Sequence, residues 1–263
     1  MQDLIISLAP FALSGALVGL LVGLTGVGGG SLMTPLLTII FGVPPGIAVG
    51  TDLAFAALTK GVGTVAHREH GHVRWDIVGY LAIGSLPCAI ATIFLIKQFG
   101  SIDASWHHVI KVSIGISVFL TALSLLFRKS LLIWVENHPK AQLHGNTQRI
   151  ATVIVGAVIG VLVTISSIGA GAIGATLILL LYPKLRAPEV AGTDIAYAVP
   201  LTALAGLGHW WLGNVHFDLL AGLLIGSFPA IWLGARLSKA LPEKYVRGTL
   251  ATTLTLVGIK LVS

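Results

Sequence analysis

The chain has 263 residues, of which 55% are hydrophobic and only 10% are charged, and its mean hydropathy is +0.94. This composition excludes a soluble globular domain, because no polar stretch between the apolar runs is long enough to form one. The formal net charge of +6 is expected to come from basic loops on one side of a membrane rather than from nucleic-acid binding. The single cysteine, Cys88, excludes an intrachain disulfide and a cysteine-ligated metal cluster.

The first apolar run, 4–24, is long enough to cross a hydrocarbon core about 30 Å thick. It lacks a basic leader and a small-residue cleavage site, so we expect a retained helix rather than a signal peptide. Nine more hydrophobic segments follow, at 29–42, 46–66, 76–97, 108–127, 150–166, 171–182, 190–208, 217–235 and 246–262. The sequence therefore predicts an all-α polytopic membrane protein.

The second and seventh segments are too short for a full crossing, since 29–42 would cover only about 21 Å as a helix. Each follows a glycine-rich stretch, TGVGGGS at 25–31 and SSIGAGAIG at 166–174. Each glycine in a helix costs about 1 kcal/mol relative to alanine. Both short segments are therefore predicted to be halves of broken helices.

The basic residues predict which side of the membrane each loop faces. If the N-terminus is outside and all ten segments cross, twelve of the 16 Lys and Arg residues fall in inside loops, as the positive-inside rule requires. Both termini are then outside. Five tryptophans lie near predicted helix ends, where their rings prefer the membrane interface: Trp75, Trp106, Trp210, Trp211 and Trp232.

The two halves of the chain repeat each other at an offset of 142 residues, without a gap from position 50 to 87. The Gly-Thr-Asp triplet at 50–52 matches the one at 192–194, and His67 matches His209. Because each copy holds five segments, the copies are predicted to insert in opposite orientations, as inverted repeats do in secondary transporters. The predicted organisation is an N-terminal repeat at 1–128, a cytoplasmic linker at 129–149 and a C-terminal repeat at 150–263.

The two glycine-rich breaks form the strongest candidate binding site. Unwound backbone at membrane depth is tolerated only where it lines a cavity or is buried in protein, and the helix that follows offers free N–H groups and a positive dipole end to an anion. The alternative is close helix packing by small residues. We expect the breaks to meet in one central anion site with the candidate ligands Gly26, Gly28, Gly29, Gly30, Ser31, Ser166, Ser167, Gly169 and Gly171.

Charged residues in the following helices add to this site, which Thr51 and Thr193 are also expected to line. An ionisable group in a membrane helix costs about 3 kcal/mol or more, so Asp52 and Asp194 suggest proton coupling or orientation of site residues. Capping of a helix N-terminus explains them equally well. Lys60 is a candidate to neutralise a bound anion, and the alternative is that its side chain extends to the lipid headgroups.

His67 and His209 occupy equivalent positions and are candidates for proton coupling, with interface hydrogen bonding as the alternative. The cluster HREHGH at 67–72 lacks the HExxH spacing, so neither a metal site nor a cofactor is predicted. An intramembrane hydrolase built on Ser166 and His209 is a weaker alternative, because Ser166 has no paired base in its own segment.

The stretches TGVGGGSLMTPLL, VGTDL and GTDIAYAVPLTALAGLGHWWLG resemble the sulfite exporter TauE/SafE family of membrane permeases, and the resemblance extends over nearly the whole chain. It implies export of sulfite, sulfoacetate or a related sulfur-containing anion by secondary, proton-linked transport. We further expect a location in the bacterial inner membrane and alternating access in which proton uptake drives anion exit, with a passive uniporter as the open alternative. The implied partners are a small anion and the lipid bilayer, and self-association into a homo-oligomer stays open. An anion channel that uses the same helix dipoles is the main alternative.

Overall fold

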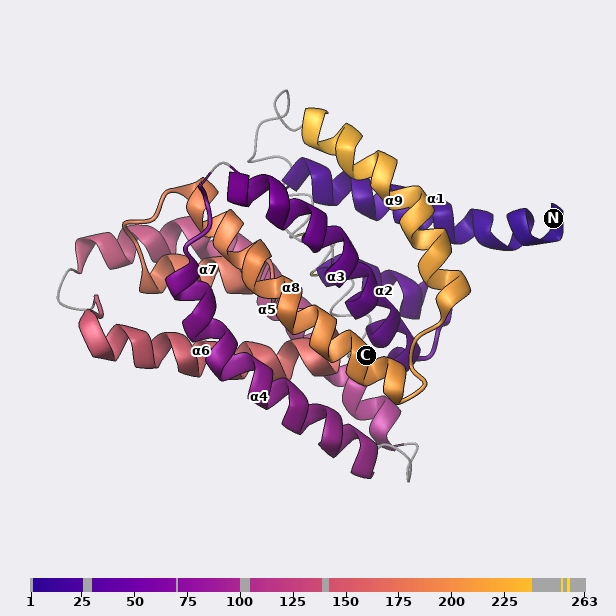
Figure 1. Ribbon diagram of the computed structural model, residues 1–263, viewed down its shortest axis with the longest axis horizontal. Helices are drawn as coiled ribbons and strands as arrows, with labels where there is room; N and C mark the ends of the chain where they lie inside the picture. The colour runs from indigo at the N-terminus through magenta and orange to yellow at the C-terminus, as the bar shows by residue number, and fades with distance from the viewer. Residues whose placement is uncertain are drawn as a thin grey trace.

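The computed structural model describes residues 2–25, 30–69, 71–99, 105–138 and 142–237, together with 252 and 255. These ranges contain nine α-helices and no strand (Figure 1), which confirms the predicted all-α class for this part of the chain. The helices are α1 (Gln2–Thr25), α2 (Gly30–Ile39), α3 (Pro45–Glu69), α4 (Trp75–Phe99), α5 (Ser105–Asn137), α6 (Gly145–Ser166), α7 (Ala172–Leu181), α8 (Ala187–Trp211) and α9 (Phe217–Leu237). The tenth predicted segment, 246–262, lies outside the described residues except for 252 and 255.

Five of these helices have segments that are long and apolar enough to cross a membrane, namely Trp75–Phe99, His108–Arg128, Gly145–Ser166, Ala187–Trp211 and Phe217–Gly234. Large apolar side chains remain on their outer surfaces, and Phe94 and Ile154 are 57% and 58% exposed. Such surfaces are unfavourable in water and expected in lipid. The chain is therefore a multi-pass membrane protein. Helix α3 is also long, but the buried polar residues Asp52 and Lys60 lower its hydropathy.

The short second and seventh segments form the short helices α2 and α7, with ten residues each. Ten helical residues extend about 15 Å, half of the hydrocarbon core. The break before α7 is described in full, and it contains three residues with positive φ: Ser167, Gly169 and Gly171. Most of α7 is buried, so this unwound backbone is enclosed by protein rather than lipid, as required. The centre of the other break, 26–29, lies outside the described residues.

Helices from opposite halves of the chain pack in pairs, α1 along α9 and α4 along α6 (Figure 1). Their backbones approach so closely that a Cβ atom on Gly15 would collide with the backbone of Leu223, and one on Gly156 with the backbone of Leu81. These two contacts are related by the sequence repeat, since Leu223 is 142 residues after Leu81 and Gly156 is 141 after Gly15. The matching contacts agree with the duplicated sequence, while the opposite orientation of the copies stays a prediction.

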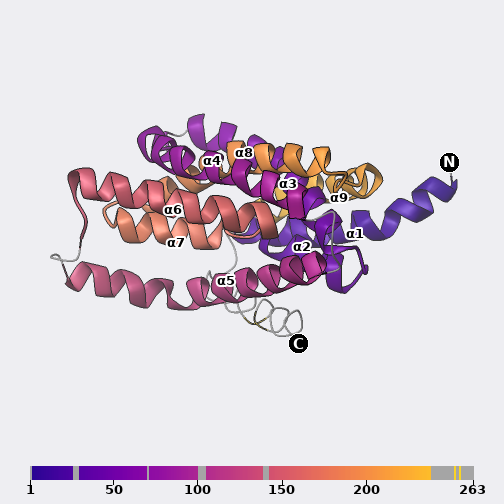
Figure 2. The same cartoon turned by 90° about the horizontal axis from the view of Figure 1, so that it is seen from below.

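Helices α3 and α8 lie side by side in the middle of the molecule. Figure 2 shows α6 and α7 between α4 and α8 on one side and α5 on the other. The second turns of α3 and α8 are held by loops from the opposite half. The His216 amide donates a hydrogen bond to Thr51 Oγ1 at 3.1 Å, and the Arg74 amide donates one to Thr193 Oγ1 at 3.0 Å. These reciprocal bonds position the aspartates that follow, Asp52 and Asp194.

Candidate functional site

Asp52 connects α3 to the short helix α2 and to the second break. Its carboxyl group is fully buried, and Oδ2 accepts a hydrogen bond from Thr34 Oγ1 at 2.6 Å. The Thr34 amide and the Ser167 hydroxyl also lie close to this carboxyl group. Apart from this contact with each other, Asp52 Oδ1 and Ser167 Oγ have no hydrogen-bond partner among the described residues. The site therefore contains buried polar atoms whose hydrogen-bonding capacity is free for a ligand.

Asp194 belongs to α8, and its side chain lies against the N-terminus of the other short helix, α7. It is 4% exposed and interacts with the backbone amide of Gly171, which precedes the first residue of α7 at φ 147°. In the first turn, a Cβ atom on Gly174 would collide with Asp194 Oδ1. A carboxyl group of the protein itself thus lies at the helix N-terminus, where the sequence predicts an anion.

Lys60 lies between these two aspartates. Its side chain is only 7% exposed, and Nζ donates a hydrogen bond to the carbonyl oxygen of Ala170, in the second break, at 2.7 Å. It also interacts electrostatically with Asp194 and Asp52. The ammonium group is therefore buried at the break and does not extend to the membrane surface.

The three charged groups give the site its electrostatic character. When all three are ionised, Asp52, Asp194 and Lys60 have a net charge of −1, and they are buried among helices where charge interactions are poorly screened. An incoming anion would be repelled by the two carboxylates and attracted by the one ammonium group. Protonation of one carboxyl group makes the cluster neutral. A bound anion would therefore be repelled less strongly by the singly protonated cluster than by the fully ionised one.

The two serines of the second break differ in their contacts. Ser166 Oγ donates to the carbonyl oxygen of Leu162 at 2.7 Å, lies 3.1 Å from Ser117 Oγ and accepts from the amide of Ile168. Its contacts fix the C-terminus of α6. The Ser167 hydroxyl, by contrast, is buried and has no partner in the described structure other than the nearby Asp52 carboxyl group. Of this pair, Ser167 is the better candidate ligand.

His209 is fully buried, and both of its ring nitrogens have partners. Nε2 lies 2.9 Å from the carbonyl oxygen of Thr164, and Nδ1 lies 3.4 Å from the side-chain nitrogen of Asn214. Because a carbonyl can only accept, Nε2 carries the proton and Nδ1 accepts from the amide. This neutral imidazole connects α8 to α6. Its two ring nitrogens bind Thr164 and Asn214 rather than Ser166, the serine of the hydrolase alternative.

The remaining predicted ligands are only partly described. Gly30 and Ser31 begin α2, although the Ser31 side chain is not described, and His67 lies in α3 with its side chain likewise outside the description. Gly26, Gly28 and Gly29 fall in the undescribed stretch 26–29. The structure thus brings together Asp52, Lys60, Ser167, Gly171 and Asp194, while the hydroxyls of Thr51 and Thr193 accept bonds from loop amides.

Three polar residues near the aspartates were not among the predicted ligands. Thr34 binds Asp52, and Tyr197 lies close to Ser85 and within electrostatic range of Asp194. The repeat holds a signal for two of them: Thr34 matches Thr176, and Tyr197 matches Phe55 at the same offset. Because a buried phenylalanine fills the equivalent position in the other half, packing alone does not require the Tyr197 hydroxyl.

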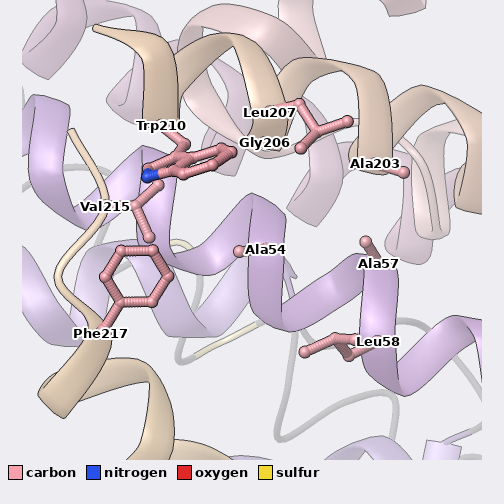
Figure 3. Close-up of a pocket in the computed structure, with 9 residues that line it drawn as sticks. All are labelled: Ala54, Ala57, Leu58, Ala203, Gly206, Leu207, Trp210, Val215 and Phe217. Atoms are coloured by element: carbon pink, nitrogen blue, oxygen red, sulfur yellow. The ribbon is translucent and has the colours of Figure 1, made fainter. Parts of the chain in front are cut away.

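An apolar groove of about 360 Å³ lies between α3, α8 and the start of α9 (Figure 3). Its lining includes Ala54, Leu207, Trp210 and Phe217, and contains no charged side chain. A small anion needs charged or hydrogen-bonding partners, so this groove does not fit one.

A second cavity, of about 260 Å³, has several polar and charged residues in its lining and lies where α4, α6 and α8 begin. Arg74 and Lys184 line it, together with Gln142, His144 and Gln148. Arg74 pairs with Asp76 at 3.1 Å, whereas Lys184 has no ion pair within the described ranges. The backbone amide of Arg74 also binds Thr193, which precedes Asp194. A residue that lines the cavity is therefore hydrogen-bonded to the neighbour of Asp194 in the central cluster. The cavity lies on the side of the membrane that the sequence predicts to be cytoplasmic.

Comparisons with known proteins agree with this description of a membrane protein. The family model for the sulfite exporter TauE/SafE matches residues 11–261. The chain is 36% identical to the probable membrane transporter protein YjnA of Bacillus subtilis (strain 168), over 95% of this chain and 98% of the relative. It is 29% identical to the probable membrane transporter protein YdhB of the same organism, over 93% and 96% of the two chains. It is 27% identical to the probable membrane transporter protein MJ0441 of Methanocaldococcus jannaschii, over 93% and 91%. No solved structure matches this chain.

Proposed function

Because this membrane transporter belongs to the sulfite exporter TauE/SafE family, we propose that it exports a small sulfur-containing anion across the bacterial inner membrane. Sulfite and organosulfonates such as sulfoacetate are the candidate substrates. The observation that carries the proposal is the buried ammonium group of Lys60, hydrogen-bonded to the break before α7 and close to Asp52 and Asp194.

In this proposal the anion binds where donors and acceptors of the protein now interact with one another. Lys60 Nζ is bound to the carbonyl oxygen of Ala170, and the Gly171 amide interacts with Asp194. A substrate oxyanion would take over both donors, and the Ser167 hydroxyl, which now lies beside the Asp52 carboxyl group, would supply a third. Hydrogen bonds from charged or oriented donors to an anionic oxygen are stronger than those between neutral groups.

The charge of the cluster favours binding of the anion together with a proton. With Asp52, Asp194 and Lys60 all ionised, an added anion would increase a net negative charge in a poorly screened interior. This differs from the sequence-based expectation that proton uptake drives anion exit. A divalent anion that leaves with one proton still moves one net negative charge outward. The membrane potential, negative inside, favours this by about 2.3 kcal/mol per 100 mV.

Alternating access between the two repeats completes the proposal. The pairing of α1 with α9 and of α4 with α6, and the reciprocal bonds of Thr51 and Thr193 to loop amides, support two related halves. In this proposal these halves move relative to each other around the breaks. Opposite insertion, both termini outside and a cytoplasmic linker at 129–149 belong to this proposal.

The test is anion flux in proteoliposomes with sulfite, sulfate, thiosulfate and sulfonates offered in turn. We expect saturable flux of at least one sulfur-containing anion and a response to an imposed pH gradient. Flux that rises linearly with concentration and ignores the gradient would favour a channel. Absence of flux for every sulfur-containing anion, in a preparation that is folded by circular dichroism, would overturn the proposed function.

A further inference from the structure

Two hydroxyl groups beside the central cluster are buried, and among the described residues they have no partner other than each other. Tyr197, on α8, and Ser85, on α4, are both fully buried. Their side chains lie close to each other, and Tyr197 is within electrostatic range of Asp194. Beyond this mutual contact, neither Tyr197 Oη nor Ser85 Oγ has a hydrogen-bond partner among the described residues. A bond between the two hydroxyls can use only one of their two protons, so at least one donor is left free. Buried hydroxyls are normally paired, because leaving one unpaired costs free energy.

The sequence repeat shows that packing does not require these free hydroxyls. Phe55, at the position equivalent to Tyr197, is also buried, with 2% exposure. An aromatic ring without a hydroxyl therefore satisfies the equivalent position in the other half. Ser227 is equivalent to Ser85, and its hydroxyl donates to the carbonyl oxygen of Leu224 at 3.3 Å. The free pair is thus a feature of one half only.

The pair lies near Asp194, the carboxyl group that interacts with Lys60 and with the Gly171 amide of the proposed anion site. Asp194 interacts with Lys60 and also lies within electrostatic range of Tyr197. The hydroxyls come from α4 and α8, whereas Lys60 comes from α3, so the donors approach from different helices. An anion with several oxygen atoms would offer one oxygen to Lys60 and another to the hydroxyl pair. A halide ion has a single acceptor atom, so it offers no separate acceptor to each group.

We propose that the Ser85 and Tyr197 hydroxyls donate hydrogen bonds to oxygen atoms of the transported anion and select oxyanions over halides. This rests on the proposed function and adds the specificity-determining residues to it. A site built to hydrogen-bond substrate oxygens discriminates against a ligand that cannot reach its donors, because the buried donors are then left unpaired.

The experiment compares Tyr197→Phe and Ser85→Ala with the matched control Ser227→Ala. Sulfite affinity is measured from the concentration dependence of flux and from the sulfite-induced rise in Tm of the purified protein, with chloride as the comparison anion. Each of the first two variants is expected to bind sulfite about 10- to 100-fold more weakly. Their Tm without sulfite is expected to stay the same or rise, and Ser227→Ala should retain wild-type affinity.

Unchanged sulfite affinity in both variants would overturn this inference and leave the proposed function intact. A lower Tm without sulfite, combined with an equal loss of flux for sulfite and chloride, would also overturn it, since both hydroxyls would then be structural. A wild-type protein that neither transports nor binds any sulfur oxyanion would overturn the proposed function and this inference together.

Discussion

The ammonium nitrogen of Lys60 lies 2.7 Å from the carbonyl oxygen of Ala170, and this bond ties the middle of α3 to the unwound backbone before α7. The two residues are 110 positions apart and come from different halves of the chain. A buried cation thus lies at the break, where the proposed anion would need it.

Replacing this cation should impair transport more than it impairs folding. In Lys60→Met the apolar stem is kept and the charge is lost, so we expect sulfite flux to fall about 10- to 100-fold at subsaturating concentrations. Lys97→Met is the control, because Lys97 lies at the end of α4 over the ring of Trp211. Proteoliposome flux checks this, and wild-type flux in Lys60→Met would remove Lys60 from the binding site.

The aspartates should determine how transport responds to pH. Asn is nearly isosteric with Asp but carries no titratable proton, so Asp52→Asn and Asp194→Asn should reduce or abolish the response of flux to an imposed pH gradient. Asp218→Asn, at the exposed start of α9, should keep the wild-type response. The measurement is initial flux at several pH gradients with the membrane potential clamped. A full wild-type response in both central variants would exclude these aspartates as the coupling groups.

Much of the fold could be predicted from the hydrophobic segments and from the sequence repeat. Nine of the ten hydrophobic segments correspond to described helices, because long apolar runs and their basic flanks are strong local signals. The glycine runs also indicated the short α2 and α7 correctly, since consecutive glycines disfavour helix continuation.

The partners of individual side chains could not be predicted in the same way. Nothing in the sequence shows that Lys60 binds Ala170, or that Ser166 fixes the end of α6 while Ser167 lies near Asp52. These contacts depend on how helices from distant parts of the chain pack together. The alignment of Tyr197 with Phe55 is visible in the repeat. That the Tyr197 hydroxyl is not needed for packing could be inferred only once the structure showed both residues to be buried.

Gly174 should be essential because a larger residue would displace Asp194. A Cβ atom at position 174 would collide with Asp194 Oδ1, so Gly174→Ala should lower both Tm and flux. Gly79→Ala is the matched control within α4, where an added Cβ atom meets nothing within 4 Å. That change should leave flux intact and stabilise the helix by up to about 1 kcal/mol. Equal behaviour of the two variants would contradict the close contact between α7 and Asp194.

His209 should matter for stability rather than for proton coupling. Its ring bonds to Thr164 and Asn214 connect α8 to neighbouring segments, and loss of a buried hydrogen bond costs about 1–3 kcal/mol. We therefore expect His209→Gln to lower Tm while the protein that remains folded keeps its response to a pH gradient. A variant with normal Tm and no pH response would return His209 to the list of coupling residues.

The position of a bound oxyanion is the most direct test of the central claim, and selenite, a pyramidal oxyanion like sulfite, can be located by its anomalous scattering. An experimental structure of the full chain soaked in selenite should place the selenium beside Lys60, with an oxygen within hydrogen-bond distance of Nζ and the anion next to Asp194. Selenium found only in the polar cavity near Lys184, or nowhere in protein that transports sulfite, would contradict the assignment of the break and Lys60 as the anion site.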